Sequence, residues 1–269
     1  WLSWAELFIA AFRWDERWRE YLKKFLLKFD ESFKLAEGCD DPKILGRIYL
    51  MAGCWYNAFG LQLVEDEREQ REHFDKGLGL LEKALVFAKK AKDNEVIVWD
   101  LFYLDWNALF GGRFEYLQKR IFDDLHEIVE LGKVYEGSYT ITRFHGNFLP
   151  AFYYANFAQR GFFTSDQRKS YAEKAIEHAK ESLKTFSFPP YSTWPYQALT
   201  WSHSQLAALA TAKDERDEHA QKMLQYAQQA AKIAEKYEGG WVRASGYTSL
   251  WRAYKTLADI SDNEEERIK

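Results

Sequence analysis

Leu81-Glu82-Lys83-Ala84-Leu85 is the first copy of a pattern that decides the fold, because it occurs four times along the chain. The later copies are Leu117-Gln118-Lys119-Arg120-Ile121, Ala172-Glu173-Lys174-Ala175-Ile176 and Ala220-Gln221-Lys222-Met223-Leu224. Three copies continue with small residues at helical spacing, namely Ala88 and Ala91, Ala179 and Ser182, and Ala227 and Ala230. Small residues on one helix face allow a second helix to approach closely, so the pattern predicts repeated, closely packed helices.

A second pattern alternates with the first at a period near 50 residues. Its copies are Trp55-Tyr56-Asn57-Ala58-Phe59-Gly60, Asp105-Trp106-Asn107-Ala108-Leu109-Phe110, Tyr153-Tyr154-Ala155-Asn156-Phe157-Ala158 and Trp201-Ser202-His203-Ser204-Gln205-Leu206. Counted at Asn57, Asn107, Asn156 and Ser204, these copies stand 50, 49 and 48 residues apart. A fixed period is typical of stacked repeats, so each repeat is expected to be a hairpin of two helices.

The spacing of apolar residues predicts helix almost throughout. Apolar residues recur every three or four residues, and the alternating runs typical of β-strands are absent. Gly, Pro and capping residues interrupt this spacing at 38–42, 93–94, 111–112, 136–138, 161–166, 187–192, 213–214, 238–240 and 261–263. We therefore expect an all-α fold of about ten or eleven helices, arranged as a right-handed superhelix (α-solenoid) of antiparallel helical hairpins.

The repeat boundaries predict a single domain, 1–269. Its parts are a divergent N-terminal hairpin at 1–38, repeats at 39–92, 93–136, 137–190 and 191–238, and a C-terminal helix with a truncated next helix at 239–269. Ser261-Asp262-Asn263-Glu264 resembles a capping box that opens this next helix. Because a helix of about one and a half turns is unstable alone, we expect the natural protein to continue past residue 269.

The repeats resemble the tetratricopeptide repeat, in a divergent form with longer units. Leu45-Gly46-Arg47-Ile48-Tyr49-Leu50-Met51-Ala52-Gly53 is similar to the first-helix motif of that family, and Leu250-Trp251-Arg252-Ala253-Tyr254 with Ala258 is a looser copy. The small residues of the second helices match as well. The resemblance implies that the first helices line a concave face, and that asparagines on it pair with the backbone of a bound peptide.

Composition and charge exclude several classes of protein. A formal net charge of −4 and a pI near 6.0 give no attraction to nucleic acid or to an anionic membrane surface. The longest apolar stretches are too short for a membrane-spanning helix. Cys39 and Cys54 are too few for a disulfide framework, so two free thiols in a cytoplasmic protein are expected.

No catalytic signature stands out. The six histidines lack metal-binding spacing on one helix, and neither a Gly-rich phosphate loop nor a Gly-x-Ser-x-Gly motif is present. Asp123-Asp124-Leu125-His126-Glu127 resembles the aspartate-rich magnesium motif of terpene synthases, but the second metal-binding motif of that family is missing. We therefore expect a non-enzymatic protein without cofactor or metal, with this acidic segment on an exposed helix face.

The repeated aromatic and asparagine residues are the candidates for binding. Aromatic residues make up 17% of the chain, and Trp and Tyr supply large contact areas at interfaces. The candidate site residues are Trp55, Asn57, Trp106, Asn107, Arg143, Tyr153, Asn156, Arg160, Trp201 and His203. They predict a module that binds a protein or peptide on its concave face, as the sensing or docking arm of a larger regulatory protein. Rings at this spacing are also typical of a packed core, so both interpretations stay open.

The segment from Phe144 to Phe157 suggests an alternative. Aromatic residues surround this predicted helix, and a helix that is apolar on every side is either buried or lines a cavity. Pro150 is expected to bend it and free a backbone carbonyl. The alternative function is a sensor or carrier of a small apolar ligand, held in an aromatic-lined cavity.

Overall fold

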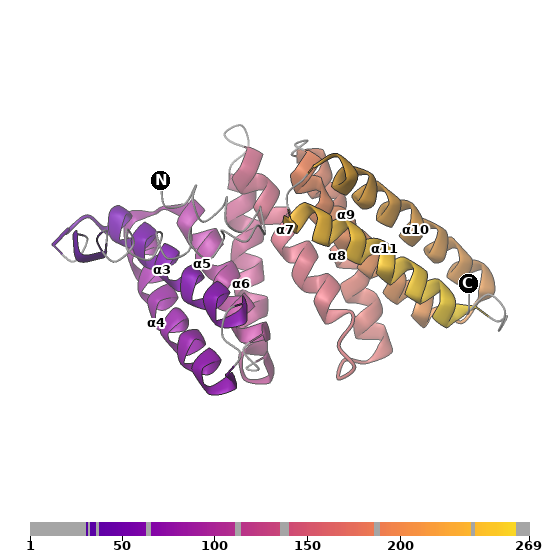
Figure 1. Ribbon diagram of the computed structural model, residues 1–269, viewed down its shortest axis with the longest axis horizontal. Helices are drawn as coiled ribbons and strands as arrows, with labels where there is room; N and C mark the ends of the chain where they lie inside the picture. The colour runs from indigo at the N-terminus through magenta and orange to yellow at the C-terminus, as the bar shows by residue number, and fades with distance from the viewer. Residues whose placement is uncertain are drawn as a thin grey trace. The chain divides into compact units, whose positions relative to one another are not determined.

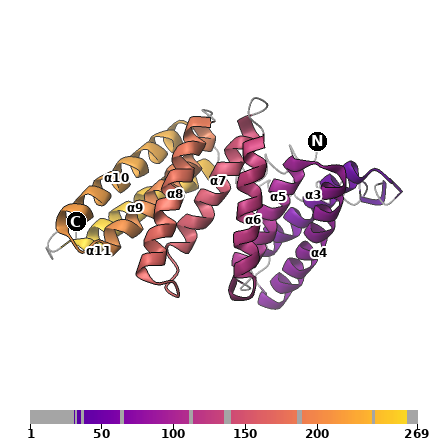
Figure 2. The same ribbon diagram turned by 180° about the vertical axis from the view of Figure 1, so that it is seen from behind.

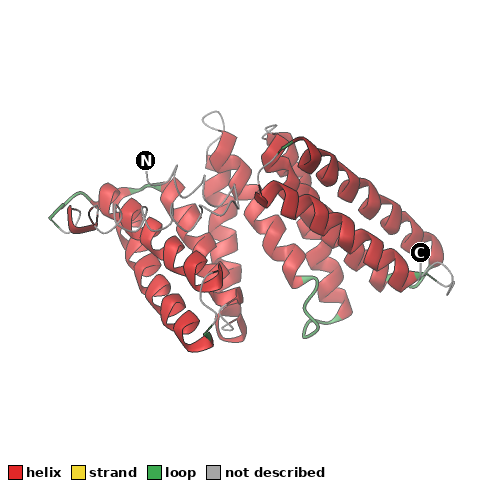
Figure 3. Ribbon diagram, in the orientation of Figure 1, coloured by secondary structure: helices red, strands yellow, loops and turns green. Residues whose placement is uncertain are grey.

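The computed structural model describes residues 31, 33–35, 38–62, 66–110, 114–134, 140–185, 189–237 and 240–261. Within these residues the chain forms helices and no strand (Figure 3), so the all-α prediction is confirmed for them. The helices are α3 (Pro42–Gln62), α4 (Glu67–Ala91), α5 (Asn94–Phe110), α6 (Phe114–Val134), α7 (Thr140–Phe157), α8 (Ser165–Thr185), α9 (Pro189–Leu209), α10 (Lys213–Lys236) and α11 (Gly240–Ile260). Most of the predicted N-terminal hairpin and the predicted truncated helix lie outside the described residues.

Most helix boundaries lie where Gly, Pro and capping residues predict them. Helices begin at Pro42, Asn94 and Gly240, each within a predicted break. Pro189 lies within a predicted break as well, and it begins α9. The fixed φ of proline suits the first turn of a helix. Neither Pro150 in α7 nor Pro195 in α9 ends its helix.

One boundary was missing from the sequence prediction, namely the turn between α3 and α4. Asp66 caps α4 there: its Oδ1 accepts hydrogen bonds from the backbone N–H groups of Arg68 and Glu69 at 3.0 and 2.9 Å. An acidic cap with a glutamate three residues later is a start signal for a helix, even without Gly or Pro nearby. The signal was therefore present in the sequence.

Among the described residues, those up to Val134 form one compact unit and those from Thr140 onward form a second. In the first unit, α3 packs against α4 and α5, and α5 packs against α4 and α6 (Figures 1 and 2). In the second unit, α9 packs against α7, α8, α10 and α11. The superhelix stays a prediction.

Small residues bring α3 and α4 together in the first unit. A Cβ atom placed on Gly46 would lie 3.2 Å from the backbone nitrogen of Ala88, which leaves almost no room for a side chain. Ala84 and Ala88 of the repeated pattern are fully buried in this contact region. The predicted packing face of the second helix is thereby confirmed.

Small residues also bring helices together in the second unit. Ala175 and Ala179 of α8 are buried in one cluster with Ala151 and Ala155 of α7. Helices α10 and α11 run side by side in both views (Figures 1 and 2). A Cβ atom on Gly246 of α11 would lie 2.5 Å from Ala234 Cβ and 2.9 Å from the carbonyl oxygen of Ala230.

Helix α9 is buried on most of its surface although it carries many hydroxyl groups. Thr200 and Ser202 donate to carbonyl oxygens one turn earlier, each at 2.8 Å. The hydroxyl groups of Ser204 in α9 and Thr256 in α11 lie 2.7 Å apart. These bonds satisfy polar groups that would otherwise be costly to bury.

Gly246→Ala is expected to lower the free energy of unfolding by about 1–3 kcal/mol, because the new methyl group meets backbone atoms of α10. The matched control is Gly79→Ala on α4, where a Cβ meets nothing within 4 Å. The control should be neutral or stabilising by up to about 1 kcal/mol, from helix propensity. Urea unfolding followed by circular dichroism measures both. Equal stability of Gly246→Ala and the wild-type protein would contradict the close approach.

Candidate functional site

Four of the predicted site residues are buried. Trp55, Asn107, Tyr153 and His203 have almost no exposed surface. A buried side chain contacts a partner only after local rearrangement. The prediction that these four side chains line an open face is therefore wrong for this conformation. Their burial indicates that these residues pack inside the helical units.

The asparagines form hydrogen bonds within the chain. Asn107 Nδ2 donates to the carbonyl oxygen of Phe74 in α4 at 3.0 Å, so it joins two helices of the first unit. Asn156 is partly exposed, and its Nδ2 donates to the carbonyl oxygen of Phe152 one turn earlier at 2.8 Å. One side-chain N–H of Asn107 and one of Asn156 are therefore engaged within the chain.

The remaining predicted residues differ in what the structure says of them. Arg160 is partly exposed in the turn after α7, where its backbone N–H donates to the carbonyl oxygen of Phe157 at 3.0 Å. Asn57, Trp106 and Arg143 lie on α3, α5 and α7, and their side chains fall outside the described residues.

Three partly exposed side chains from three different helices lie next to one another in the second unit, and we call them the first-helix row. The ring centroids of Phe152 in α7 and Trp201 in α9 are 6.2 Å apart. The guanidinium carbon of Arg252 in α11 lies 5.2 Å from the centroid of the Trp201 ring. Trp201 was predicted as a site residue, whereas Phe152 was only part of the aromatic segment and Arg252 only part of the loose motif copy.

Arg252 is a half-buried cation with no carboxylate partner among the described residues. Burial alone lowers the pKa of its guanidinium from the ordinary value. The indole ring of Trp201 provides a cation–π contact. The indole N–H of Trp201 is itself buried without a hydrogen-bond partner. Both groups therefore have unused capacity for hydrogen bonds.

The structure brings two histidines together that lie far apart in sequence. His203 Nδ1 of α9 and His219 Nδ1 of α10 are 3.1 Å apart. His203 Nε2 is buried without a partner. We assign the proton of His203 to Nδ1, since a buried N–H without an acceptor costs more than a buried lone pair.

Carboxyl groups are buried inside the first unit. Both oxygens of Asp100 in α5 are buried without a hydrogen-bond partner, and burial raises the pKa of this group to about 9. Burial, followed by the charge and hydrogen bond of Asp124, raises the pKa of Asp105 well above its usual value. Arg120 Nε donates to Asp124 Oδ2 at 3.3 Å.

These contacts correct the expectation for the acidic segment. Asp123 lies on an exposed face as expected, but Asp124 is half-buried and engaged with Arg120 and Asp105. No three His, Cys, Asp or Glu residues among those described are placed to hold a metal ion. The resemblance to the magnesium motif therefore gains no support from the geometry.

The aromatic segment of α7 forms core as far as it is described. Leu149, Tyr153 and Phe157 are fully buried. The Phe157 ring contacts Tyr171 of α8 at 5.8 Å and Phe163 of the following turn at 6.2 Å between centroids. This packing favours core over a ligand-lined cavity.

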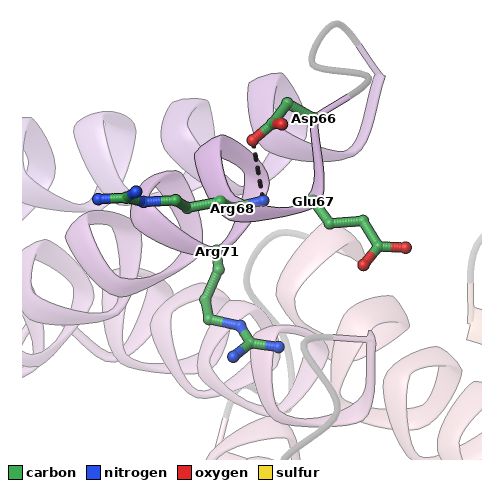
Figure 4. Close-up of a pocket in the computed structure, with 4 residues that line it drawn as sticks. All are labelled: Asp66, Glu67, Arg68 and Arg71. Atoms are coloured by element: carbon green, nitrogen blue, oxygen red, sulfur yellow. Dashed lines mark hydrogen bonds between the residues drawn. The ribbon is translucent and has the colours of Figure 1, made fainter.

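A surface hollow lies at the start of α4 (Figure 4). It is lined by Asp66, Glu67, Arg68 and Arg71, which are all exposed. Asp66 already caps the helix, and the charges are mixed. The hollow therefore has no arrangement that selects a ligand.

Helix α11 carries exposed aromatic side chains that the sequence analysis did not select. Tyr247, Trp251 and Tyr254 are 50%, 61% and 58% exposed. Their spacing of four and three residues places them on one helix face. The signal was available in part, because Ala253 of the motif copy lies on the opposite face of the helix and is buried.

Comparisons with known proteins do not assign the chain to a family. No protein-family model matches the chain, and no curated protein is significantly similar to it. Among the described helices, none has both the length and the apolar character needed to cross a membrane.

The buried carboxyl group of Asp100 predicts a pH dependence of stability. The folded protein holds a proton on Asp100 that the unfolded chain releases near pH 4, so the free energy of unfolding should fall as the pH rises from about 4 to about 9. Asp100→Asn should reduce this slope, while Asp123→Asn, on the exposed face of α6, should leave it unchanged. Urea unfolding at pH 5 and pH 8 measures the slope, and an unchanged slope in Asp100→Asn contradicts the assignment.

The histidine pair predicts the opposite pH dependence for the second unit. The pKa of His203 is lowered to about 3, mainly by burial and then by the charge of His219. His203 should therefore stay neutral at pH 5, whereas the unfolded chain is protonated below about pH 6.5, so this contribution to stability is lost as the pH falls. Ring nitrogen chemical shifts measured by NMR should show a neutral imidazole protonated at Nδ1. A charged His203 at pH 5 contradicts this.

Proposed function

We propose that the chain is a non-enzymatic helical module that binds an acidic segment of a protein or peptide along the first-helix row of its second unit. The observation that carries the proposal is the contact series Phe152, Trp201 and Arg252, in which two partly exposed rings lie beside a cation without a carboxylate partner. Aromatic rings and arginine are the side chains that most often dominate binding energy at interfaces.

The charges of the helices support an acidic partner. Helices α7, α9 and α11 together carry four basic residues, Arg143, Arg243, Arg252 and Lys255, against one acidic residue, Asp259. Helix α9 carries no charged residue, whereas α8 and α10 carry charges of both signs. The helices that carry the row therefore have an excess of basic residues, of which Arg252 is the one within the row, in a chain of net charge −4.

A role as the docking arm of a larger regulatory protein follows from the same proposal. Binding without catalysis delivers a partner to another domain rather than changing it chemically. The resemblance to tetratricopeptide repeats is compatible with this role, and it stays a proposal.

Selection from a random peptide library displayed on phage tests the proposal. The selected peptides should be acidic, and calorimetry should show that Arg252→Gln weakens their binding by about tenfold or more, because a partly buried charge pair is lost. The matched control is Lys232→Gln, which removes the same charge from the exposed side of α10.

Two outcomes would contradict the proposal. One is that no peptide is selected. The other is that the selected peptides bind Arg252→Gln as tightly as the wild-type chain. Either outcome removes the first-helix row as the binding surface.

A further inference from the structure

A second surface on α11 has a regular order of aromatic and basic side chains. Arg243, Tyr247, Trp251 and Lys255 follow one another at intervals of four residues, and all four are exposed. Lys255 Nζ lies 5.7 Å from the centroid of the Trp251 ring. Tyr254 lies beside the row, three residues after Trp251. We call this set the α11 stripe.

The α11 stripe is distinct from the first-helix row. Successive residues of a helix point about 100° apart, so Trp251 and its neighbour Arg252 face different directions. Arg252 packs over Trp201 of α9, whereas Trp251 is 61% exposed. A ligand on one surface therefore does not require the other.

The three exposed rings of α11 form one apolar patch. Each ring offers an area on the order of 100 Å² when half-exposed, so the three together form a patch of about 300 Å². The opposite face of α11 is already used, because Ala253 is buried against Met223 and Ala227 of α10. A patch of this kind along a helix fits the apolar face of another helix.

The charges determine what kind of helix fits. Arg243 precedes Tyr247 and Lys255 follows Trp251, so the two cations stand at the two ends of this aromatic pair. They are about 18 Å apart along the helix axis. An antiparallel second copy centred on the pair would place Arg243 opposite Lys255 at both ends, and a parallel copy would place each cation opposite itself. Like charges in contact oppose association, so a second copy of this chain fits poorly.

We infer that the α11 stripe is a docking site for an amphipathic helix of another protein, with Asp or Glu at both ends of its apolar face. Its apolar side chains cover Tyr247, Trp251 and Tyr254, and its carboxylates pair with Arg243 and Lys255. The two acidic residues of the partner lie about twelve residues apart, to match the distance between the two cations.

A pair of synthetic helical peptides tests the inference. The first carries leucines on one face between two glutamates about twelve residues apart, and the second has lysines in place of the glutamates. Calorimetry with the full chain should show binding of the glutamate peptide and at least about tenfold weaker binding of the lysine peptide. Lys255→Glu should reduce the difference in affinity between the two peptides, because it reverses the charge at one end of the stripe.

Variants locate the binding. Trp251→Ala should weaken binding of the glutamate peptide by about tenfold or more. The control Val86→Ala truncates a side chain on α4 that is 66% exposed, and it should leave binding unchanged. Arg252→Gln should also leave it unchanged, so failure of the α11 stripe and failure of the first-helix row are distinguishable.

Three results would overturn the inference. They are no binding of the glutamate peptide up to about 1 mM, equal binding of the two peptides, and unchanged binding to Trp251→Ala. Sedimentation velocity adds a fourth: a dimer of the wild-type chain that is lost in Trp251→Ala would make a second copy the occupant instead.

Discussion

Close approach of helices through small residues is the constraint on which the rest of the structure depends. Gly46 meets the backbone of Ala88 in the first unit, and Gly246 meets Ala230 and Ala234 in the second. Because these contacts leave no space for larger side chains, bulky residues lie at other positions, such as the contact of Phe157 with Tyr171 of α8 and the exposed face of α11.

The same division positions the two proposed surfaces. Phe152 and Trp201 lie between neighbouring helices of the second unit and stay partly exposed, and Arg252 packs over the indole ring without a carboxylate partner. Helix α11 uses its small residues against α10, so Trp251 on its other face is exposed. The candidate binding groups are thus the bulky and charged residues that the small-residue contacts exclude.

Helix content and most helix boundaries could be predicted from the sequence, because apolar spacing, Gly, Pro and caps are local signals. The cap at Asp66 was missed, although an acidic cap with a glutamate three residues later is a local signal of the same kind. The candidate site was harder to predict, because repetition alone does not separate packing residues such as Tyr153 from lining residues such as Trp201. The pairing of His203 with His219 and the isolation of Arg252 depend on contacts between helices, which no local pattern encodes.

Native-state hydrogen exchange tests the packing account most directly, because it measures the free energy of opening at each backbone amide. If small residues lock α3 to α4, amides on both helices should share one opening free energy and lose protection together as denaturant is added. The amides near Ala84 and Ala88 should be among the slowest to exchange in the first unit. If the amides of α4 open at a clearly lower free energy than the amides of α3, the account is contradicted.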